Sequence, residues 1–362
     1  MSPQLRTPLC DRLGIDVPVM QAGMGNVAYG RLAAAVSNAG GLGSIGGIDI
    51  PPEEVEAEIR LFRSLSDRPL CVDLGFPANA PKGLDDVAVP ELPGPLRQLE
   101  SELGEHGIEV VPTTDQAISL ADNKRKLEIS LDHGVEVIAC ALGTPEWVVQ
   151  ECHARGATVM SIVGQAKHAR SAIRHGTDIV VVQGTEGGGH SGDVGLITLL
   201  AEVLEFAGDV PVVAAGGLVK GSQIAACLTL GAQGVWVGTR FLASAESGSE
   251  DVFKEAVVDA EYDSTLRSLL FDGLHVRMLR NRFTEVWEGH EDELSPYPIQ
   301  RVLTMPFKYA AMKANLKSHM SLPSGAGAGM ITEVPGAAEI LERLVQETVD
   351  ALTGVPKSVE FG

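Results

Sequence analysis

The chain has few cysteines and no close pair of them. Its five cysteines are scattered, without a CxxC spacing, at Cys10, Cys71, Cys140, Cys152 and Cys227. Such spacing offers neither a disulfide framework nor a cysteine metal site, and it is typical of a reducing compartment. We therefore expect each thiol to be a small buried apolar side chain.

Basic residues and long apolar runs are also scarce. The chain has 28 Lys and Arg against 48 Asp and Glu, a formal net charge of −20, which argues against nucleic acid or an anionic membrane as a partner. No segment approaches the roughly 20 apolar residues of a membrane span. The first residues, MSPQLRTPLCDRLG, contain no apolar signal core. We expect a cytoplasmic protein whose 44% hydrophobic residues bury a sizeable core.

Several common catalytic motifs are missing. The sequence contains no HExxH, no GxSxG and no pair of carboxylates at a useful spacing. Residues 41–46, GLGSIG, match the dinucleotide fingerprint, which needs a strand before it and a helix opening within it. A helical, alanine-rich segment precedes this match, and IDIPPEE follows it. We interpret its glycines as a helix-to-strand junction and the start of a strand.

Short apolar runs alternate with helical patterns along the first two thirds of the chain. The predicted strands are residues 17–23, 41–47, 70–76, 135–143, 157–164, 178–184, 210–217 and 234–241. The predicted helices between them are 29–39, 53–66, 115–133, 145–155, 165–175, 196–206 and 220–230. Eight strands alternating with helices predict an α/β fold, a TIM (β/α)8 barrel.

Two segments break this alternation. Residues 79–111 are long and rich in Pro and Gly, which predicts an insertion between the third and fourth strands. We further expect the barrel to span 1–261, a small inserted helical cap 262–320 and a closing helix to lie within 321–362. Residues 265–320 hold eight Lys and Arg against six Asp and Glu, a local charge of +2. Most of these side chains should be solvated, but one or two could bind an anionic substrate.

Residues 180–192, VVVQGTEGGGHSG, are the strongest functional signal in the residues themselves. A buried strand ends there in several glycines and His190. Glycines permit close approach of a ligand, and a histidine can exchange a proton near neutral pH. Because an exposed glycine-rich turn would look the same, this segment alone leaves both interpretations open.

The ends of the seventh and eighth predicted strands are also rich in glycine. Such barrels usually hold a phosphate in the loops after these two strands. Backbone N–H groups of Gly216, Gly217, Gly238 and Thr239 could donate to it. A phosphate site is therefore favoured over ordinary turns.

These segments together resemble a known family. The ordered blocks are QAGMG (21–25), AAAVSNAGGLGSIGG (33–47), VVVQGTEGGGHSG (180–192), PVVAAGG (211–217) and LGAQGVWVGTRFLASAES (230–247). They resemble the nitronate monooxygenases, also called 2-nitropropane dioxygenases, and the related flavin-dependent enoyl-acyl-carrier-protein reductases. The resemblance continues in HVRMLRNRFTEVWE (275–288) and GAGAGMI (325–331), and it is more specific for the superfamily than for the reaction.

The resemblance implies FMN bound to a TIM barrel. His190 matches the catalytic histidine of the family, which handles the α-proton of a nitro compound or stabilises the nitronate. The implied cofactor-binding residues are Gln21, Ala22, Gly23, Met24, Asp73, Gln183, Gly188, Gly189, Gly216, Gly217, Gly238 and Thr239. No metal ligand is implied.

The chain departs from the family at three places near the implied cofactor. Gly23 stands where the family usually has proline, and Asp73 where it usually has asparagine. An ionised Asp73 would disfavour an anionic reduced flavin. Residues 139–143, ACALG, replace a common SFHFG, so a second histidine is missing and the site should be more apolar there.

Three functions remain open from the sequence. The first is an FMN-dependent oxidation of nitronates or nitroalkanes with O2 and without NAD(P)H. The second is an enoyl-thioester reductase that takes hydride from NAD(P)H, and the third is an inactive flavin-binding barrel. The retained His190 argues against the third. An acidic carrier protein would need a basic docking surface, and the predicted cap, with its local charge of +2 over residues 265–320, is only a weak candidate for one. This favours a small substrate. A homodimer is a default expectation.

Overall fold

Eight parallel strands form the centre of the molecule. The computed structural model describes residues 5–77, 90–111 and 119–354. The strands are β1 (Val19–Gln21), β2 (Gly43–Gly46), β3 (Leu70–Gly75), β4 (Val137–Ala141), β5 (Thr158–Val163), β6 (Ile179–Gln183), β8 (Val212–Ala215) and β9 (Gly234–Val237). They pair in parallel in the order β1-β9-β8-β6-β5-β4-β3-β2. A parallel bridge between Met20 and Leu42 joins the two outer strands, so the sheet closes into a barrel.

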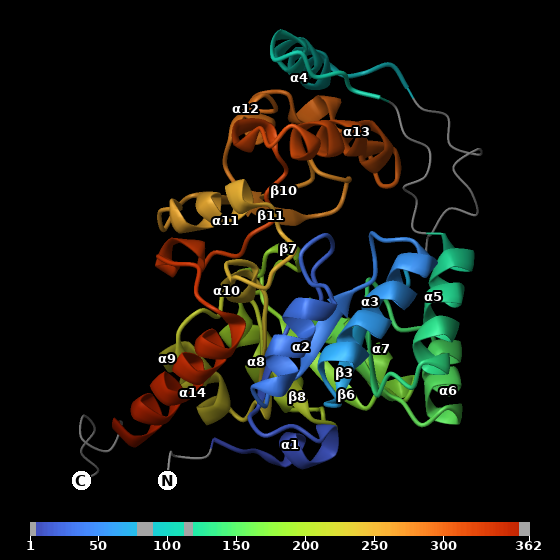
Figure 1. Ribbon diagram of the computed structural model, residues 1–362, viewed down its shortest axis with the longest axis vertical. Coiled ribbons are helices and arrows are strands. Elements are labelled where there is room, and N and C mark those ends of the chain that lie inside the picture. The colour runs from blue at the N-terminus through green and yellow to red at the C-terminus, as the bar shows by residue number, and fades with distance from the viewer. Residues whose placement is uncertain (1–4, 78–89, 112–118, 355–362) are drawn as a thin grey trace.

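Helices surround this barrel (Figure 1). They are α2 (Gly30–Asn38), α3 (Pro52–Leu65), α5 (Leu120–Asp132), α6 (Glu146–Ala154), α7 (Ala166–Arg174), α8 (Leu196–Leu204), α9 (Gly221–Leu230) and α14 (Ala337–Gly354). The short α1 (Pro8–Leu13) lies at the bottom of the barrel in this view. The closing helix α14 packs between α9 and α2. The predicted TIM barrel and all eight predicted strands are confirmed.

The strand and helix patterns follow from burial. The barrel strands are buried on both faces, because side chains inside and helices outside exclude water. Their sequences are therefore nearly continuous apolar runs, whereas α3 shows a buried stripe of Val55, Ile59 and Phe62. All five cysteines are buried and free, as expected. The start of the helix predicted over 115–133 lies outside the described residues.

A cap covers one end of the barrel (Figure 1). It contains α11 (Asp251–Val258), β10 (Thr265–Ser268), β11 (Val276–Leu279), α12 (Arg282–Glu285) and α13 (Ile299–Lys313). The cap is not built of helices alone. Its two strands form an antiparallel sheet with β7 (Gly189–His190), a short strand that follows β6 of the barrel.

The predicted insertion supplies a further helix to the cap. Within the predicted range 79–111, residues 78–89 are not described, but α4 (Gly94–Glu105) lies beside α12 and α13. Leu96, Leu99 and Leu103 join the apolar cluster of the cap, which includes Phe283. A segment between β3 and β4 therefore completes a unit whose other elements come about 150 residues later in the chain.

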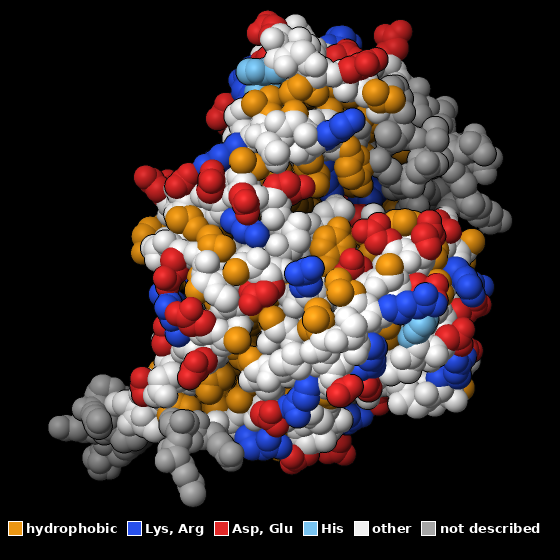
Figure 2. Space-filling model, viewed as in Figure 1, with side chains coloured by type: hydrophobic (Ala, Val, Ile, Leu, Met, Phe, Trp, Pro, Cys, Tyr) orange, Lys and Arg blue, Asp and Glu red, His pale blue; other side chains and the backbone are white. Residues whose placement is uncertain are grey.

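Charges are mixed over the described side chains on the face shown in Figure 2. Lys and Arg alternate there with Asp and Glu, and no broad basic surface is visible on that face. Within the described residues, no helix is long and apolar enough to cross a membrane.

Candidate active site

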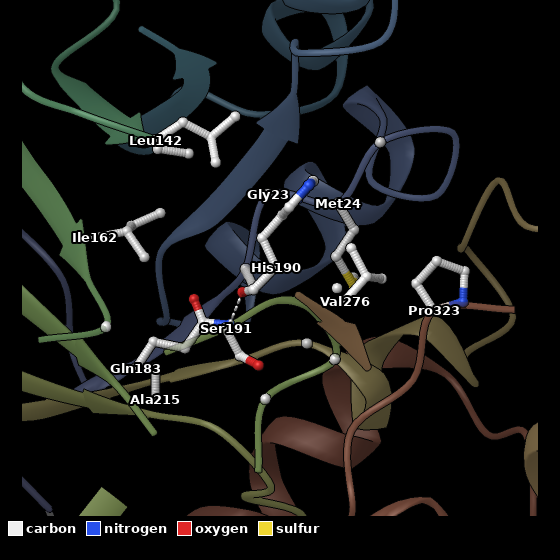
Figure 3. Close-up of a pocket in the computed structure, with 18 of the residues that line it drawn as sticks. Gly23, Met24, Leu142, Ile162, Gln183, His190, Ser191, Ala215, Val276 and Pro323 are labelled. Carbon is white, nitrogen blue, oxygen red and sulfur yellow. Dashed lines mark hydrogen bonds between the residues drawn. The ribbon is translucent and has the colours of Figure 1, made fainter. Parts of the chain in front are cut away.

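The carboxyl ends of the barrel strands and the cap enclose a cavity of about 1000 Å³. Figure 3 shows part of its lining, with Met24, Ile162, Gln183 and His190 from different strands and loops. This volume lies at the upper end for ligand sites, so it offers room for a cofactor and a substrate together.

The structure brings together nearly all the residues predicted from the sequence. His190 lines the cavity, as do Ala22, Gly23, Met24, Asp73, Gln183, Gly188, Gly189, Gly216, Gly217, Gly238 and Thr239. Gln21 does not. It is fully buried, and its side-chain amide contacts the carbonyl of Ala22 and accepts from the N–H of Ser44. The structure therefore places Gln21 as a support of the first loop.

His190 is held by both barrel and cap. Its backbone pairs with Val276 of β11, and its carbonyl accepts a hydrogen bond of 2.8 Å from Gln183 Nε2 (dashed in Figure 3). The next residue, Ser191, donates its N–H to the carbonyl of His275. The glycine-rich turn after β6 thus becomes an edge strand that fixes the histidine at the cavity.

The cap supplies a carboxylate to this histidine. His190 Nε2 lies 2.6 Å from Asp272 Oδ2, and the side chain of Asp272 is 1% exposed. The other oxygen, Oδ1, accepts from the N–H of Leu274 at 2.9 Å. Among the described residues, the second ring nitrogen of His190, Nδ1, makes no hydrogen bond to the protein. Sequence patterns gave no signal for Asp272, because 82 residues separate the pair.

A second group of charges lies in the same cavity. Arg301 of α13 forms an ion pair of 2.8 Å with Asp49, which follows β2. Burial disfavours the charged form of Asp49, but Arg301 and Lys308 outweigh it and hold the Asp49 pKa below its usual range.

Lys308 is the other cation of this group. It is 6% exposed and lies near the rings of Phe271 and Tyr309, at 5.6 and 5.5 Å. Burial lowers its pKa, opposed by the charge of Asp49. Among the described residues, its ammonium group makes no hydrogen bond or ion pair. Arg267, Arg301 and Lys308 are thus the three of the eight basic residues in 265–320 that reach the cavity.

The loops after β6, β8 and β9 line the cavity with Gly188, Gly216, Gly217, Gly238 and Thr239, which we call the glycine cradle. Gly216 and Gly217 have φ values of +109° and +70°, which side chains rarely adopt. A Cβ on Gly188 would lie 2.7 Å from the backbone N of Gly325. That N–H in turn donates to Thr239 Oγ1 at 2.9 Å. The segment 325–331, singled out by its resemblance, therefore packs directly on the cradle.

The wall at the end of β4 is apolar, as the sequence predicts. Ala141 and Leu142 line the cavity there. Leu142 has φ +60°, a conformation that is uncommon for a bulky residue and carries strain.

The remaining histidines divide into two groups. His168, His175 and His275 also line the cavity. The others lie elsewhere: His133 contacts Glu56, His153 contacts Asp178, His290 contacts Glu293, and His319 packs with His106 and Glu102. Among the described residues, no group of three or more His, Cys, Asp or Glu could hold a metal ion.

Comparisons with known proteins agree with this fold. The "Nitronate monooxygenase" family model matches residues 6–347. A "Probable nitronate monooxygenase" of Bacillus subtilis is 31% identical, over 93% of this chain and 98% of its own. A nitroalkane oxidase structure from Streptomyces ansochromogenes is 33% identical with a TM-score of 0.84, covering 96% and 99%.

A third relative differs in the activity its name gives. A Mycobacterium tuberculosis protein described as (3aS,4S,5R,7aS)-5-hydroxy-7a-methyl-1-oxo-octahydro-1H-indene-4-carboxyl-CoA dehydrogenase is 29% identical, over 99% of this chain and all of its own. The family model spans nearly the whole chain, and the chain therefore belongs to the nitronate monooxygenase family and is an oxidoreductase of that family.

Proposed function

We propose that this enzyme binds FMN and oxidises alkyl nitronates or nitroalkanes with O2, with His190 as the catalytic base. The observation that carries this proposal is the His190–Asp272 pair at the wall of the glycine-lined cavity. When bound, FMN would accept the electrons that the substrate loses and pass them to O2.

The residues present fit this cofactor. The cradle of Gly216, Gly217, Gly238 and Thr239 suits a phosphate, since backbone there can approach an anion closely. Met24, Ile162 and other apolar side chains would contact the ring system (Figure 3). Asp73 presents a buried carboxyl oxygen, Oδ1, that has no hydrogen-bond partner in the described protein.

Asp272 prepares His190 for accepting a proton. The carboxylate accepts a hydrogen bond from Nε2–H, which selects the tautomer with a lone pair on Nδ1. Once Nδ1 has taken the α-proton of a nitroalkane, the same carboxylate stabilises the imidazolium. This arrangement supports a base role for His190 and a positioning role for Asp272.

Loss of that proton leaves a nitronate, whose negative charge lies on the nitro oxygens. Lys308 is a buried ammonium group in the same cavity and makes no protein hydrogen bond among the described residues. We assign it to those oxygens, because a fixed cation in a dry site stabilises developing negative charge. The charge of Arg301, which lies in the same cavity, is compensated by its ion pair with Asp49.

Replacement of the histidine tests the proposal. His190→Asn should retain FMN but slow turnover of a neutral nitroalkane by at least about tenfold, within the range that general base catalysis supplies. Turnover of the preformed nitronate should fall less, because its α-proton is already gone. His153→Asn, at an exposed histidine paired with Asp178, is the matched control. Unchanged nitroalkane turnover in His190→Asn would remove the base role.

A second candidate is oxidoreduction of an acyl thioester with NAD(P)H. Two observations favour it: the name of the Mycobacterium tuberculosis relative, which gives a carboxyl-CoA substrate, and a cavity of about 1000 Å³, which is large for a ligand site and has room for a bulky substrate. In that case Lys308 would face a thioester carbonyl oxygen. Reduction of the bound flavin by NADPH or NADH without oxygen discriminates the two candidates.

A further inference from the structure

Asp73 is a carboxyl group buried in the cavity wall without a partner. It lies near the end of β3, its residue is 3% exposed, and it lines the cavity. Oδ1 has no hydrogen-bond partner, and neither side-chain oxygen bonds to another described residue. A buried polar group without a partner is costly, so one facing a ligand cavity suggests that the ligand supplies the partner.

The neighbours of Asp73 offer no positive charge. Its strand partners are Gly46 of β2 and Ala139 of β4, neither of which is charged. The titratable groups close enough to feel it are the thiols of Cys71 and Cys140, both of which burial keeps neutral. Burial alone raises the pKa of Asp73 well above its ordinary value, since no nearby cation opposes it.

Gly23 leaves the space that this carboxyl occupies. A Cβ at position 23 would lie 2.3 Å from Asp73 Cβ and 2.7 Å from Oδ2. Any larger residue there would collide with the aspartate in its present position. The two departures noted in the sequence therefore touch each other: the missing side chain at 23 makes room for the carboxyl at 73.

We propose that Asp73 is a neutral carboxylic acid that donates a hydrogen bond to the ring system of the bound cofactor. The inference rests on the proposed FMN site and deepens it. A neutral acid has nearly the shape of an asparagine amide and keeps one donor, so it can replace that amide. The sequence analysis considered an ionised Asp73, which would disfavour an anionic reduced flavin. A neutral Asp73 would not, because it carries no charge to repel that of the reduced ring.

Infrared spectroscopy of the flavin-loaded enzyme tests the protonation state. Carbon-13 labelling of aspartate separates the carbonyl stretch of a protonated acid from the flavin carbonyls. At pH 7 we expect one label-sensitive acid band, lost in Asp73→Asn and retained in Asp49→Asn, whose carboxylate is held ionised by Arg301. Absence of the band in the wild type, or its persistence in Asp73→Asn, would overturn the proposal. Asp73→Ser serves the same purpose should the Asn variant not fold.

Flavin affinity tests the donor. Asp73→Asn keeps a hydrogen-bond donor, so its dissociation constant for FMN should change less than about threefold. Asp73→Ala removes the donor, so its dissociation constant for FMN should rise about three- to tenfold, as expected for the loss of one hydrogen bond. If Asp73 were ionised, Asp73→Asn would bind reduced FMN at least about tenfold more tightly relative to oxidised FMN. That result would contradict the inference.

The two readouts separate this inference from the proposed function. A protein that binds no flavin would end the FMN proposal, and with it the donor role of Asp73. A protein that binds FMN but shows no acid band would end only the inference on Asp73.

Discussion

At the scale of single residues, the site depends on side chains that meet only in the folded chain. The glycine-rich surroundings of His190 are a local signal that made it a candidate, and the resemblance to the family gave it a predicted catalytic role. Asp272, Asp49 and Lys308 have no such signal, because each is an ordinary charged residue until the fold brings the cap onto the carboxyl ends of the barrel strands. Composition predicted only that some basic residues near the end of the chain would face an anion.

The role of Asp272 can be separated from a structural one. Asp272→Asn removes the charge that stabilises the protonated imidazole, so kcat for a nitroalkane should fall at least about tenfold while KM changes little. Asp272→Glu should restore part of kcat. A variant in which KM rises and kcat holds would assign Asp272 to substrate binding instead.

Lys308 should contribute to binding of the nitronate anion. Lys308→Met removes the buried ammonium group, and KM for a preformed nitronate should rise about tenfold or more, the value of a charged hydrogen bond. Lys313→Met, at an exposed residue at the end of the same helix, is the control and should leave KM unchanged. Equal KM values in both variants would show that the substrate does not reach Lys308.

At the scale of elements, the strands of the barrel were predictable and the cap was not. Strands buried on both faces are continuous apolar runs, so all eight could be located within a few residues. The strand β7 has two residues, and its identity as a strand depends on β11, some 90 residues later in the chain. Similarly, α4 is stabilised by the cap rather than by its neighbours in sequence.

The cradle depends on the contact between the loop after β6 and the segment 325–331. Gly188→Ala would place a Cβ 2.7 Å from the backbone N of Gly325, and backbone cannot yield cheaply. We expect FMN binding to weaken by about tenfold or more, from a loss of about 1–3 kcal/mol. Gly104→Ala, where nothing lies within 4 Å of the new Cβ, should bind FMN normally. Full FMN affinity in Gly188→Ala would mean that this contact does not shape the cofactor site.

At the scale of the whole molecule, the ion pair between Asp49 and Arg301 ties the cap to the barrel. The pKa of Asp49 is lower in the folded protein than in the unfolded chain, so its contribution to stability is full above about pH 4 and is lost as the pH falls through the folded value. Asp49→Asn should therefore lower the free energy of unfolding at pH 7 by about 3 kcal/mol.

Denaturant unfolding at several pH values measures the contribution of Asp49 to the free energy of unfolding. The difference in the free energy of unfolding between wild type and Asp49→Asn should shrink below about pH 4, where Asp49 of the unfolded chain begins to bind a proton while folded Asp49 is still charged. Asp11→Asn, in an exposed pair with Arg6, is the control and should leave the free energy of unfolding nearly unchanged. If the difference in the free energy of unfolding between wild type and Asp49→Asn stayed constant from pH 7 to pH 3, the charge of Asp49 could not be the source of that difference.

The overall fold and most of the lining of the proposed cofactor site could be predicted from the sequence, because glycines at strand ends are local signals and the barrel places all strand ends together. The chemistry of the site does not, since it needs the cap over the barrel. The measurement that tests the central claim most directly is anaerobic reduction of the bound flavin. The account predicts rapid loss of the oxidised flavin band with an alkyl nitronate and none with NADPH or NADH; rapid loss with either nucleotide and none with the nitronate would contradict it.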